Sequence, residues 1–301
     1  MILKTQGLSK SYGKIRALDG LNLEIREGEI IGILGPNGSG KTTTLALVLG
    51  VIFPTEGTFE WFGGNEENFN KRLGTILETP NFYEYMSGMD NLKVVQQIKD
   101  KPGQDLEELA KMVGLSDRIH TKVKTYSLGM KQRLAIAGAM VGDPDVLIFD
   151  EPTNGLDPQG IADVRNLIID ISKTGKTIIM ASHILAEVEK ICTHTVILQK
   201  GQLLTSGPVN TILRETNAYL LEAEDTEALK NCLKSMEGYV DSHEEEGGLL
   251  VNFDENINAS HINTHCNKKG IVLSKLFKKE SSLEDAFIEM VNNHKRDGQN
   301  Q

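Results

Sequence analysis

The sequence has little cysteine, no long apolar run and no surplus of basic residues. Its three cysteines, Cys192, Cys232 and Cys266, are widely spaced and fit no metal-ligand pattern, so we interpret them as reduced thiols of a cytosolic protein. No stretch approaches the ~18 consecutive apolar residues of a membrane-spanning helix. The first residues lack the apolar core of a signal peptide. A net charge of −10 argues against nucleic-acid binding, because phosphate backbones favour a basic face.

What the sequence does contain is the composition of a globular protein. It has 301 residues, of which 39% are hydrophobic and 25% charged, which is enough for one large domain and a smaller one. The acidic surplus is concentrated late in the chain, where residues 216–301 hold 9 Lys and Arg against 16 Asp and Glu. This shift predicts a boundary near Glu215, with domains at 1–215 and 216–301.

The first motif is a glycine-rich loop at 35–42 that matches G-x-x-x-x-G-K-[ST]. It follows an apolar run at 30–34 and leads into a helical pattern at 41–49, which is the strand, loop and helix context of a phosphate loop. The backbone N–H groups of such a loop bind phosphate oxygens, and we expect its glycines to make room where a Cβ would clash with them. The predicted ligands are Gly35, Pro36, Asn37, Gly38, Ser39, Gly40, Lys41 and Thr42. Alone, this motif predicts only nucleotide binding.

Four further motifs follow in a fixed order. They are Tyr126–Arg133, Val146–Glu151, Gly155–Asp157 and Ala181–His183. Together with the phosphate loop, they make roughly the first 215 residues resemble an ATP-binding cassette (ABC) ATPase. The resemblance is to the branch that serves drug-, antibiotic- and ion-export permeases, and it implies ATP and Mg²⁺ as cofactors.

The resemblance assigns the charged residues of these motifs to catalysis. Lys41 would contact the β- and γ-phosphates, and Thr42 and Asp150 would hold Mg²⁺. Glu151 would orient or deprotonate the attacking water, and His183 would contact the γ-phosphate. Two adjacent carboxylates can also be a helix-capping turn, and a lone histidine at a strand end is commonly a surface residue. The order and spacing of the motifs favour the catalytic interpretation.

The signature motif departs from the family pattern at two positions. Leu128 stands where glycine is common, and Met130 stands where glutamine is common. Ser127 and Gly129, which the resemblance expects to touch the γ-phosphate with a hydroxyl and an N–H, are kept. Without the other motifs, Ser-x-Gly before a helix would be an ordinary N-cap.

Four more ligands come from the resemblance. Thr43 would reach a phosphate, and Asp157 would cross the interface between two subunits. Glu78 stands where most relatives carry a glutamine that senses Mg²⁺ and water, so an added negative charge must be offset there by the metal. Tyr12 matches the aromatic residue that stacks on adenine, although a surface tyrosine is the plain alternative.

The pattern of elements predicts the fold class. Strands alternate with helices through residues 1–215, which predicts an α/β cassette of the P-loop NTPase type with a mixed, largely parallel sheet. The resemblance adds an antiparallel β part and a helical subdomain. Residues 216–301 have the order strand, helix, strand, strand, helix, strand, helix, which predicts a small α+β domain resembling a ferredoxin-like unit.

We therefore expect an ATP-hydrolysing subunit of an ABC transporter. The resemblance implies a homodimer or a pair with a paralogous subunit, and a separate polytopic membrane permease that holds the protein at the cytoplasmic face of the membrane, for export. Two alternatives stay open: a soluble ABC ATPase acting on ribosomes or DNA, and a nucleotide-gated regulator. The absence of a second cassette, coiled coils or a basic patch disfavours the first, and the water-orienting Glu151 disfavours the second. The transported substrate cannot be inferred from this chain.

Overall fold

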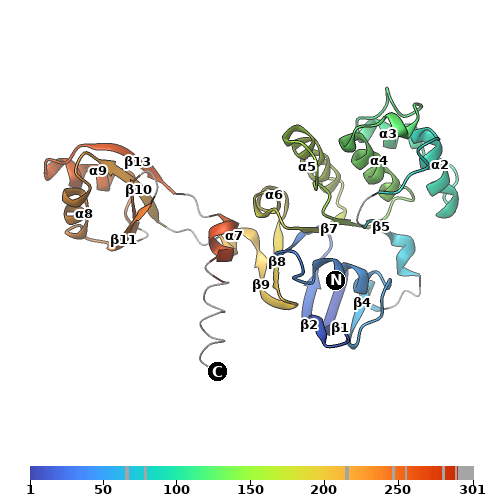
Figure 1. The fold of residues 1–301 in the computed structure, drawn as a ribbon, viewed down its shortest axis with the longest axis horizontal. Helices are drawn as coiled ribbons and strands as arrows, with labels where there is room; N and C mark the ends of the chain where they lie inside the picture. Colours follow the sequence, from blue (N-terminus) through green and yellow to red (C-terminus); the bar gives the residue numbers. More distant parts are fainter. Residues whose placement is uncertain are drawn as a thin grey trace. The chain divides into compact units, whose positions relative to one another are not determined.

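The computed structural model describes residues 1–64, 68–77, 80–213, 217–245, 248–254, 256–279, 282–288 and 290. The chain divides into two compact units: Met1–Thr211 together with the described residues from Phe287 on, and Ile212–Ala286 (Figure 1). Among the described residues, no helix has the length and apolar character needed to cross a bilayer.

A six-stranded sheet forms the centre of the first unit. The strand order is β5-β6-β7-β3-β8-β9, parallel except for the β8–β9 hairpin. The three middle strands are buried along their whole length, as the uninterrupted apolar runs predict for strands covered on both faces. The bounds are β3 (Ile30–Leu34), β5 (Leu73–Ile76), β6 (Val146–Asp150), β7 (Thr177–Ser182), β8 (His194–Gln199) and β9 (Gln202–Pro208).

Two smaller parts flank this sheet. An antiparallel sheet has the order β2-β1-β4, formed by β1 (Leu3–Tyr12), β2 (Ile15–Ile25) and β4 (Glu56–Trp61). Figure 1 shows a group of helices beyond β5, formed by α2 (Gly88–Ile98), α3 (Leu106–Met112) and α4 (Leu128–Met140). The other helical elements are α1 (Lys41–Val48), α5 (Pro158–Ser172), α6 (Leu185–Ile191), α7 (Val209–Ile212), η1 (Phe62–Gly64), η2 (Phe69–Arg72) and η3 (Val123–Thr125).

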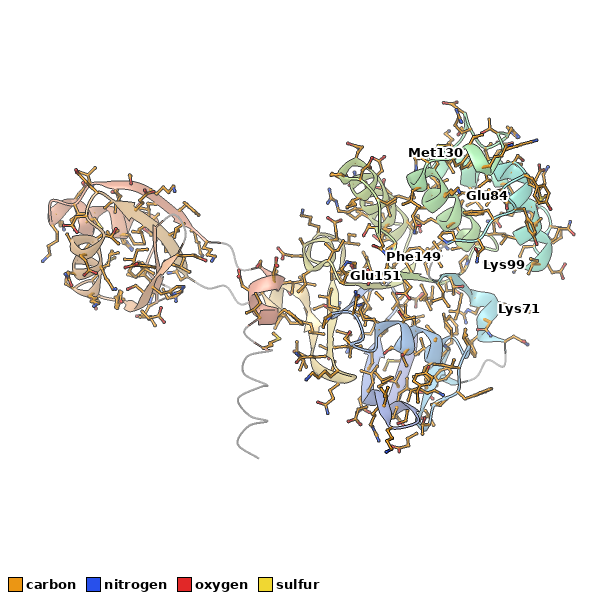
Figure 2. The ribbon with its side chains drawn as sticks, in the orientation of Figure 1. Lys71, Glu84, Lys99, Met130, Phe149 and Glu151 are labelled. Atoms are coloured by element: carbon orange, nitrogen blue, oxygen red, sulfur yellow. The ribbon has the colours of Figure 1, made fainter. Side chains whose placement is uncertain are left out.

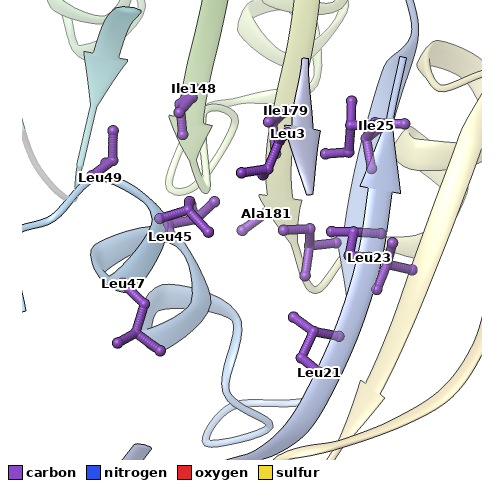
Figure 3. Close-up of a cluster of buried hydrophobic side chains, with 14 of the residues drawn as sticks. Leu3, Leu21, Leu23, Ile25, Leu45, Leu47, Leu49, Ile148, Ile179 and Ala181 are labelled. Carbon is purple, nitrogen blue, oxygen red and sulfur yellow. The ribbon is translucent and has the colours of Figure 1, made fainter. Parts of the chain in front are cut away.

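Helix α1 and the two sheets share one hydrophobic core (Figure 3). Leu21 from β2, Leu45 from α1 and Ile148 from β6 are each at most 1% exposed. Trp61 closes the core beside α1, and its indole Nε1 donates to the Val48 carbonyl at 2.6 Å. The last turn of α1 is thus fixed by a satisfied buried hydrogen bond. This core holds the start of α1, and with it the phosphate loop, against the carboxyl ends of the central strands.

In the described residues, the core of the second unit is built from a four-stranded antiparallel sheet and two helices. Its strand order is β11-β12-β10-β13, and its elements are β10 (Ala218–Ala223), α8 (Thr226–Lys234), β11 (Tyr239–Glu245), β12 (Gly248–Phe253), α9 (Ala259–Lys268) and β13 (Leu273–Lys278). Leu229, Leu249 and Ile262 belong to its own core and are fully buried. The order of strands and helices is the one that the sequence predicts, and a further helical run covers 283–288.

The first two strands are longer than the apolar pattern predicts. The sequence predicts strands at 2–8 and 21–26, whereas β1 and β2 continue to a tight hairpin in which Tyr12 pairs with Ile15. Apart from the buried Leu18, the residues between are mostly polar or exposed, so alternation does not reveal them as strand. Backbone pairing across the hairpin extends both strands instead.

Candidate nucleotide-binding site

The phosphate loop connects β3 to α1 and packs closely against its own protein. A Cβ on Gly35 would lie 2.3 Å from the Leu198 carbonyl oxygen, and one on Gly40 would lie 2.7 Å from the Ala17 carbonyl oxygen. Both residues have positive φ, at +153° and +108°. At these two positions a Cβ would already collide with the protein itself, with Leu198 and Ser39 at Gly35 and with Ala17 at Gly40. That the glycines also make room for phosphate oxygens stays a prediction.

Lys41 is buried at the bottom of this loop, with its side chain 6% exposed. Its Nζ donates to the Gly35 carbonyl at 2.8 Å and lies 3.4 Å from the Pro36 carbonyl. The same Nζ is 3.5 Å from Oε1 of Glu151. The loop therefore encloses a positive charge, and its partners are two loop carbonyls and one catalytic candidate.

The carboxyl end of β6 presents the two adjacent carboxylates. Asp150 is the last residue of the strand and is 4% exposed. Glu151 follows with φ +50°, a conformation that is uncommon and strained for a residue other than glycine. Its backbone N–H donates to the Ala181 carbonyl at 3.0 Å, which fixes the turn to β7. The strained turn brings the Glu151 side chain to Lys41, and Figure 2 shows Glu151 beside Phe149 at this end of the strand.

His183 makes the next contact after Lys41 and Glu151. Its Nδ1 lies 2.8 Å from Oε2 of Glu151, and its backbone N–H lies 3.3 Å from the same oxygen. A proton on Nδ1 makes the shorter contact a hydrogen bond. Three predicted residues from separate motifs, Lys41, Glu151 and His183, are thus brought together. Such convergence of a phosphate-loop lysine, a carboxylate and a histidine is a sound basis for phosphoryl chemistry.

A cavity of about 560 Å³ opens over the phosphate loop. This is within the range of ligand sites in proteins. The predicted residues in its lining are Asn37, Gly38, Gly40, Lys41, Thr42, Thr43 and Glu151. The side chains in the lining that the sequence analysis did not propose include Arg16 from the β1–β2 hairpin and Lys200 from the β8–β9 turn. The site thus offers three cationic side chains to an anion.

The two added cations are held by contacts that no local motif reveals. Arg16 pairs with Asp19 at 2.6 Å and with Glu56 at 3.1 Å, and the hydrogen bond to Glu56 contributes most to raising the pKa of its guanidinium. The turn that carries Lys200 is joined to the phosphate loop, because the Gly201 N–H donates to the Ser39 carbonyl at 2.9 Å. The sequence signal for Lys200 was the Lys-Gly turn after a strand, which on its own predicts only a hairpin.

The other residues predicted to bind the nucleotide differ in how exposed they are. Pro36 is exposed, whereas Ser39 is 1% exposed and lies against Gly35. Tyr12 is 51% exposed, and the Lys10 ammonium lies 5.3 Å from its ring centre. Tyr12 is not among the described residues that line the cavity, so its contact with adenine stays a prediction. Glu78 lies outside the described residues.

The signature residues lie in a different cavity, of about 390 Å³. Ser127 caps the start of α4 by accepting from the Met130 N–H at 3.3 Å, and Asp157 caps α5 by accepting from the Gly160 N–H at 2.7 Å. Both residues line this second cavity together with Gly129. No described residue is common to the linings of the two cavities. One chain therefore carries two separate groups of predicted ATP ligands.

Comparisons with known proteins decide the family. The ABC transporter family model matches residues 18–154. An uncharacterized ABC transporter ATP-binding protein of Bacillus subtilis, YdbJ, is 36% identical over 99% of this chain and 98% of its own length. The chain belongs to the ABC transporter ATP-binding proteins.

A second relative and a solved structure agree with this family. The bacitracin transport ATP-binding protein BcrA of Bacillus licheniformis is 37% identical over 96% of this chain and 97% of its own length. A dimeric ABC cassette solved in a post-hydrolysis state with ADP and Pi has a TM-score of 0.61 and 25% identity, covering 69% of this chain and 99% of that one. The predicted cassette fold is confirmed, and the chain is an ATP-binding, ATP-hydrolysing subunit of an ABC transporter.

Proposed function

We propose that two copies of this subunit, or one copy and a paralogue, close on ATP and drive a separate membrane permease that exports its substrate. The dimer is inferred from one observation: the phosphate-loop residues and the signature residues line separate cavities. Lys41 and Ser127 line different cavities of one chain, so a second chain is needed to bring Ser127 to an ATP held by Lys41. ATP binding closes this pair and hydrolysis opens it, which is the work delivered to the permease.

In the proposed site, the phosphate loop holds the β- and γ-phosphates by its backbone N–H groups and by the Lys41 ammonium. Lys41 exchanges its contacts with the Gly35 carbonyl and Glu151 for phosphate oxygens. Arg16 and Lys200 add positive charge at the rim of the same cavity. Ser127 and Gly129 of the partner subunit close over the γ-phosphate with a hydroxyl and an N–H.

Mg²⁺ fits the donor set of this site. Magnesium in phosphoryl-transfer sites takes one or two protein oxygens and completes its shell with phosphates and water. Thr42 lines the cavity and Asp150 stands beside Glu151, which supplies one hydroxyl and one carboxylate for such a shell. In the described part of the chain, no group of three or more His, Cys, Asp or Glu side chains could hold a metal alone. When bound, the ion offsets the negative charge of the phosphates.

Hydrolysis then follows from the contacts of Glu151. Its carboxylate orients a water and accepts its proton as the water oxygen attacks the γ-phosphorus, and the bond from that phosphorus to the bridging oxygen of ADP breaks. His183 holds Glu151 in position through Nδ1 and leaves Nε2 for the γ-phosphate. Lys41 stabilises the charge that develops on the transferred oxygens.

A permease partner is supported by an apolar surface in the helical part of the cassette. A cavity of about 400 Å³ is lined by Phe82, Tyr83, Leu92, Val94, Val95, Ile98 and Leu134, among others. Tyr85 and Ile98 beside it are 70% and 78% exposed. We propose that the permease covers this surface at the cytoplasmic face of the membrane. The export direction rests on the likeness to the bacitracin transport protein.

Residues 216–301 are proposed to form an accessory domain that regulates or dimerises the cassette. Helices α8 and α9 and the four strands β10 to β13 enclose a core of their own, and every residue assigned to ATP lies before position 184. We propose no nucleic-acid partner, because the acidic surplus of this part would repel phosphates.

The test is co-purification of the full chain with ATP and Mg²⁺ present. We expect the Glu151→Gln protein to form an ATP-dependent dimer and to bring down a polytopic membrane protein from detergent-solubilised membranes. Recovery of ribosomes in place of a membrane protein would contradict the transport role and favour the soluble alternative.

A further inference from the structure

The segment just before α2 is joined to the residues just before the signature serine. The Lys124 N–H donates to the Glu84 carbonyl at 3.0 Å, and the Val123 N–H donates to the Met86 carbonyl at 3.0 Å. Farther along, Ser87 and Lys122 form an isolated antiparallel bridge. Two stretches more than thirty residues apart in the sequence are thus joined by backbone hydrogen bonds three residues before Ser127, where the later stretch enters η3.

A close side-chain contact fixes the same junction. Tyr126 is 7% exposed, and its hydroxyl donates to the Arg118 carbonyl at 2.6 Å. A Cβ on Gly88 would lie 2.5 Å from that hydroxyl oxygen, so Tyr126 sits directly on the first turn of α2. Tyr126 immediately precedes Ser127 in the chain. Movement of the start of α2 must therefore move the residue that leads into the signature.

An ion pair makes the third connection, and it reaches the signature helix itself. The Lys131 Nζ lies 2.6 Å from Oε1 of Glu84, and the two side chains are 28% and 58% exposed. The Lys131 N–H donates to the Ser127 carbonyl at 2.9 Å. Figure 2 shows Glu84 near Met130, the neighbour of Lys131 on α4. Glu84 is thus linked through one side chain to the first turn of the helix that Ser127 caps.

The outer face of this segment is exposed. Tyr83 and Tyr85 are 51% and 70% exposed and contact each other edge to face, with ring centres 6.1 Å apart. Asn91, which is 5% exposed, anchors Tyr83 by accepting from its N–H at 2.9 Å and donating to its carbonyl at 3.2 Å. A rigid exposed pair of aromatic rings flanks Glu84, whose side chain contacts the signature helix.

We propose that Glu84 is a positioning residue for the signature, acting through Lys131 to hold the start of α4 so that Ser127 can meet ATP. This rests on the proposed role of Ser127. An exposed ion pair contributes only about 0.2–1 kcal/mol, so the pair does not hold the fold together. Its effect is local: the backbone hydrogen bonds from Val123 and Lys124 fix the segment that carries Glu84, and Glu84 fixes the first turn of α4. A partner that presses on Tyr83 and Tyr85 changes the signature geometry through this contact.

The test is hydrogen–deuterium exchange of residues 124–131 in the full chain without nucleotide. We expect Glu84→Gln and Lys131→Gln to raise exchange in this segment about 2- to 5-fold, the factor that matches the loss of an exposed ion pair. The reversed pair, Glu84→Lys with Lys131→Glu, should restore wild-type exchange. Asp143→Asn breaks a matched ion pair of the same 2.6 Å length with Lys176 and should leave residues 124–131 unchanged.

The proposal is overturned if exchange of residues 124–131 is unchanged in both single variants, or if it rises equally in Asp143→Asn. It is also overturned if the reversed pair does not restore wild-type exchange. A second readout separates it from the proposed function. The single variants should lower kcat 2- to 5-fold while the dissociation constant for ATP stays the same, because the phosphate loop is untouched. If the protein does not dimerise when ATP is added, the proposed dimer is refuted. The exchange experiment needs no nucleotide and would still decide the role of Glu84.

Discussion

The two compact units differ in where they place polar groups. Within the described residues, every buried polar or charged side chain lies in the unit Met1–Thr211, including Lys41, Asp150 and Glu187. The core of the unit Ile212–Ala286 is made of apolar side chains, one tyrosine and two cysteines. Burying charge and holding Glu151 at φ +50° cost free energy, and proteins retain such features at functional sites. This difference supports our proposal that ATP binds to the first unit and that the second is an accessory domain.

The largest effect in this comparison is expected from Lys41→Ala. The substitution removes the cation from the bottom of the phosphate loop and releases the Glu151 carboxylate. We expect kcat/KM for ATP to fall about 10³-fold or more, since the charge on the transferred phosphate then loses its main side-chain partner. A steady-state phosphate-release assay measures this.

Lys176→Ala is the matched control for Lys41→Ala. Lys176 is also largely buried, pairs with a carboxylate at 2.6 Å and donates to the Pro144 carbonyl at 2.7 Å, yet it does not line the cavity. Its removal should leave kcat/KM within a factor of about three. Equal losses in the two variants would contradict the assignment of Lys41 to phosphate binding.

Glu151→Gln should separate hydrolysis from binding. The amide keeps the shape of the side chain but cannot accept the proton of the attacking water, so kcat should fall about 10²-fold. The dissociation constant for ATP, measured by fluorescence titration, should change little. Wild-type turnover in this variant would remove Glu151 from the mechanism.

Truncating one buried leucine in each unit compares how the two units contribute to stability and to ATP binding. Leu45 in α1 and Leu229 in α8 are both fully buried, so truncation to alanine should cost about 2–5 kcal/mol of unfolding free energy in either place. Leu45→Ala should also weaken ATP binding, because α1 carries Lys41 and Thr42. Leu229→Ala should leave ATP affinity unchanged while denaturant unfolding shows its own unit melting earlier. Loss of ATP binding in Leu229→Ala would show that the second unit completes the site.

The smallest expected effect is the change with pH that Lys99 causes in the free energy of unfolding. Its Nζ donates to the Ala139 and Val141 carbonyls at 3.1 and 2.7 Å, and burial lowers its pKa from 10.5 to about 8. Between pH 8 and 10.5, the unfolded chain holds a proton at this amine that the folded chain has lost. Stability from this group therefore rises with pH in that window. Wild-type protein should gain stability relative to Lys99→Met between pH 7.5 and 9.5. A relative loss would mean that burial does not dominate its pKa.

The parts of the site that could be predicted from the sequence are those whose chemistry is local. Eight consecutive residues specify the phosphate loop, and an apolar run delivers Asp150 and Glu151 to the end of a strand. The contact of Glu151 with both Lys41 and His183 follows from the order of the parallel strands β6, β7 and β3, which is why three separate motifs converge.

The contacts that could not be predicted depend on packing between distant segments. Lys200 reaches the cavity because the β8–β9 turn bonds to Ser39, and Arg16 reaches it because β1 and β2 extend to their hairpin. Leu128, which stands where the family commonly has glycine, lies close to Gly155: a Cβ on Gly155 would be 3.4 Å from the Leu128 Cδ2. The sequence does not reveal this contact. Side-chain neighbours of this kind are set by the three-dimensional fold, and no spacing within one motif encodes them.

We propose that Ser127 contacts ATP only across the interface between two chains. The most direct test adds Ser127→Arg to the Glu151→Gln protein and measures both ATP affinity and ATP-dependent dimerisation. We expect the single Glu151→Gln variant to form a dimer with ATP. The double variant should stay monomeric with an unchanged dissociation constant for ATP, since Lys41 and the phosphate loop are intact. If Ser127→Arg instead weakens ATP binding to the monomer as strongly as Lys41→Ala does, the two groups of ligands act within one chain and the account is wrong.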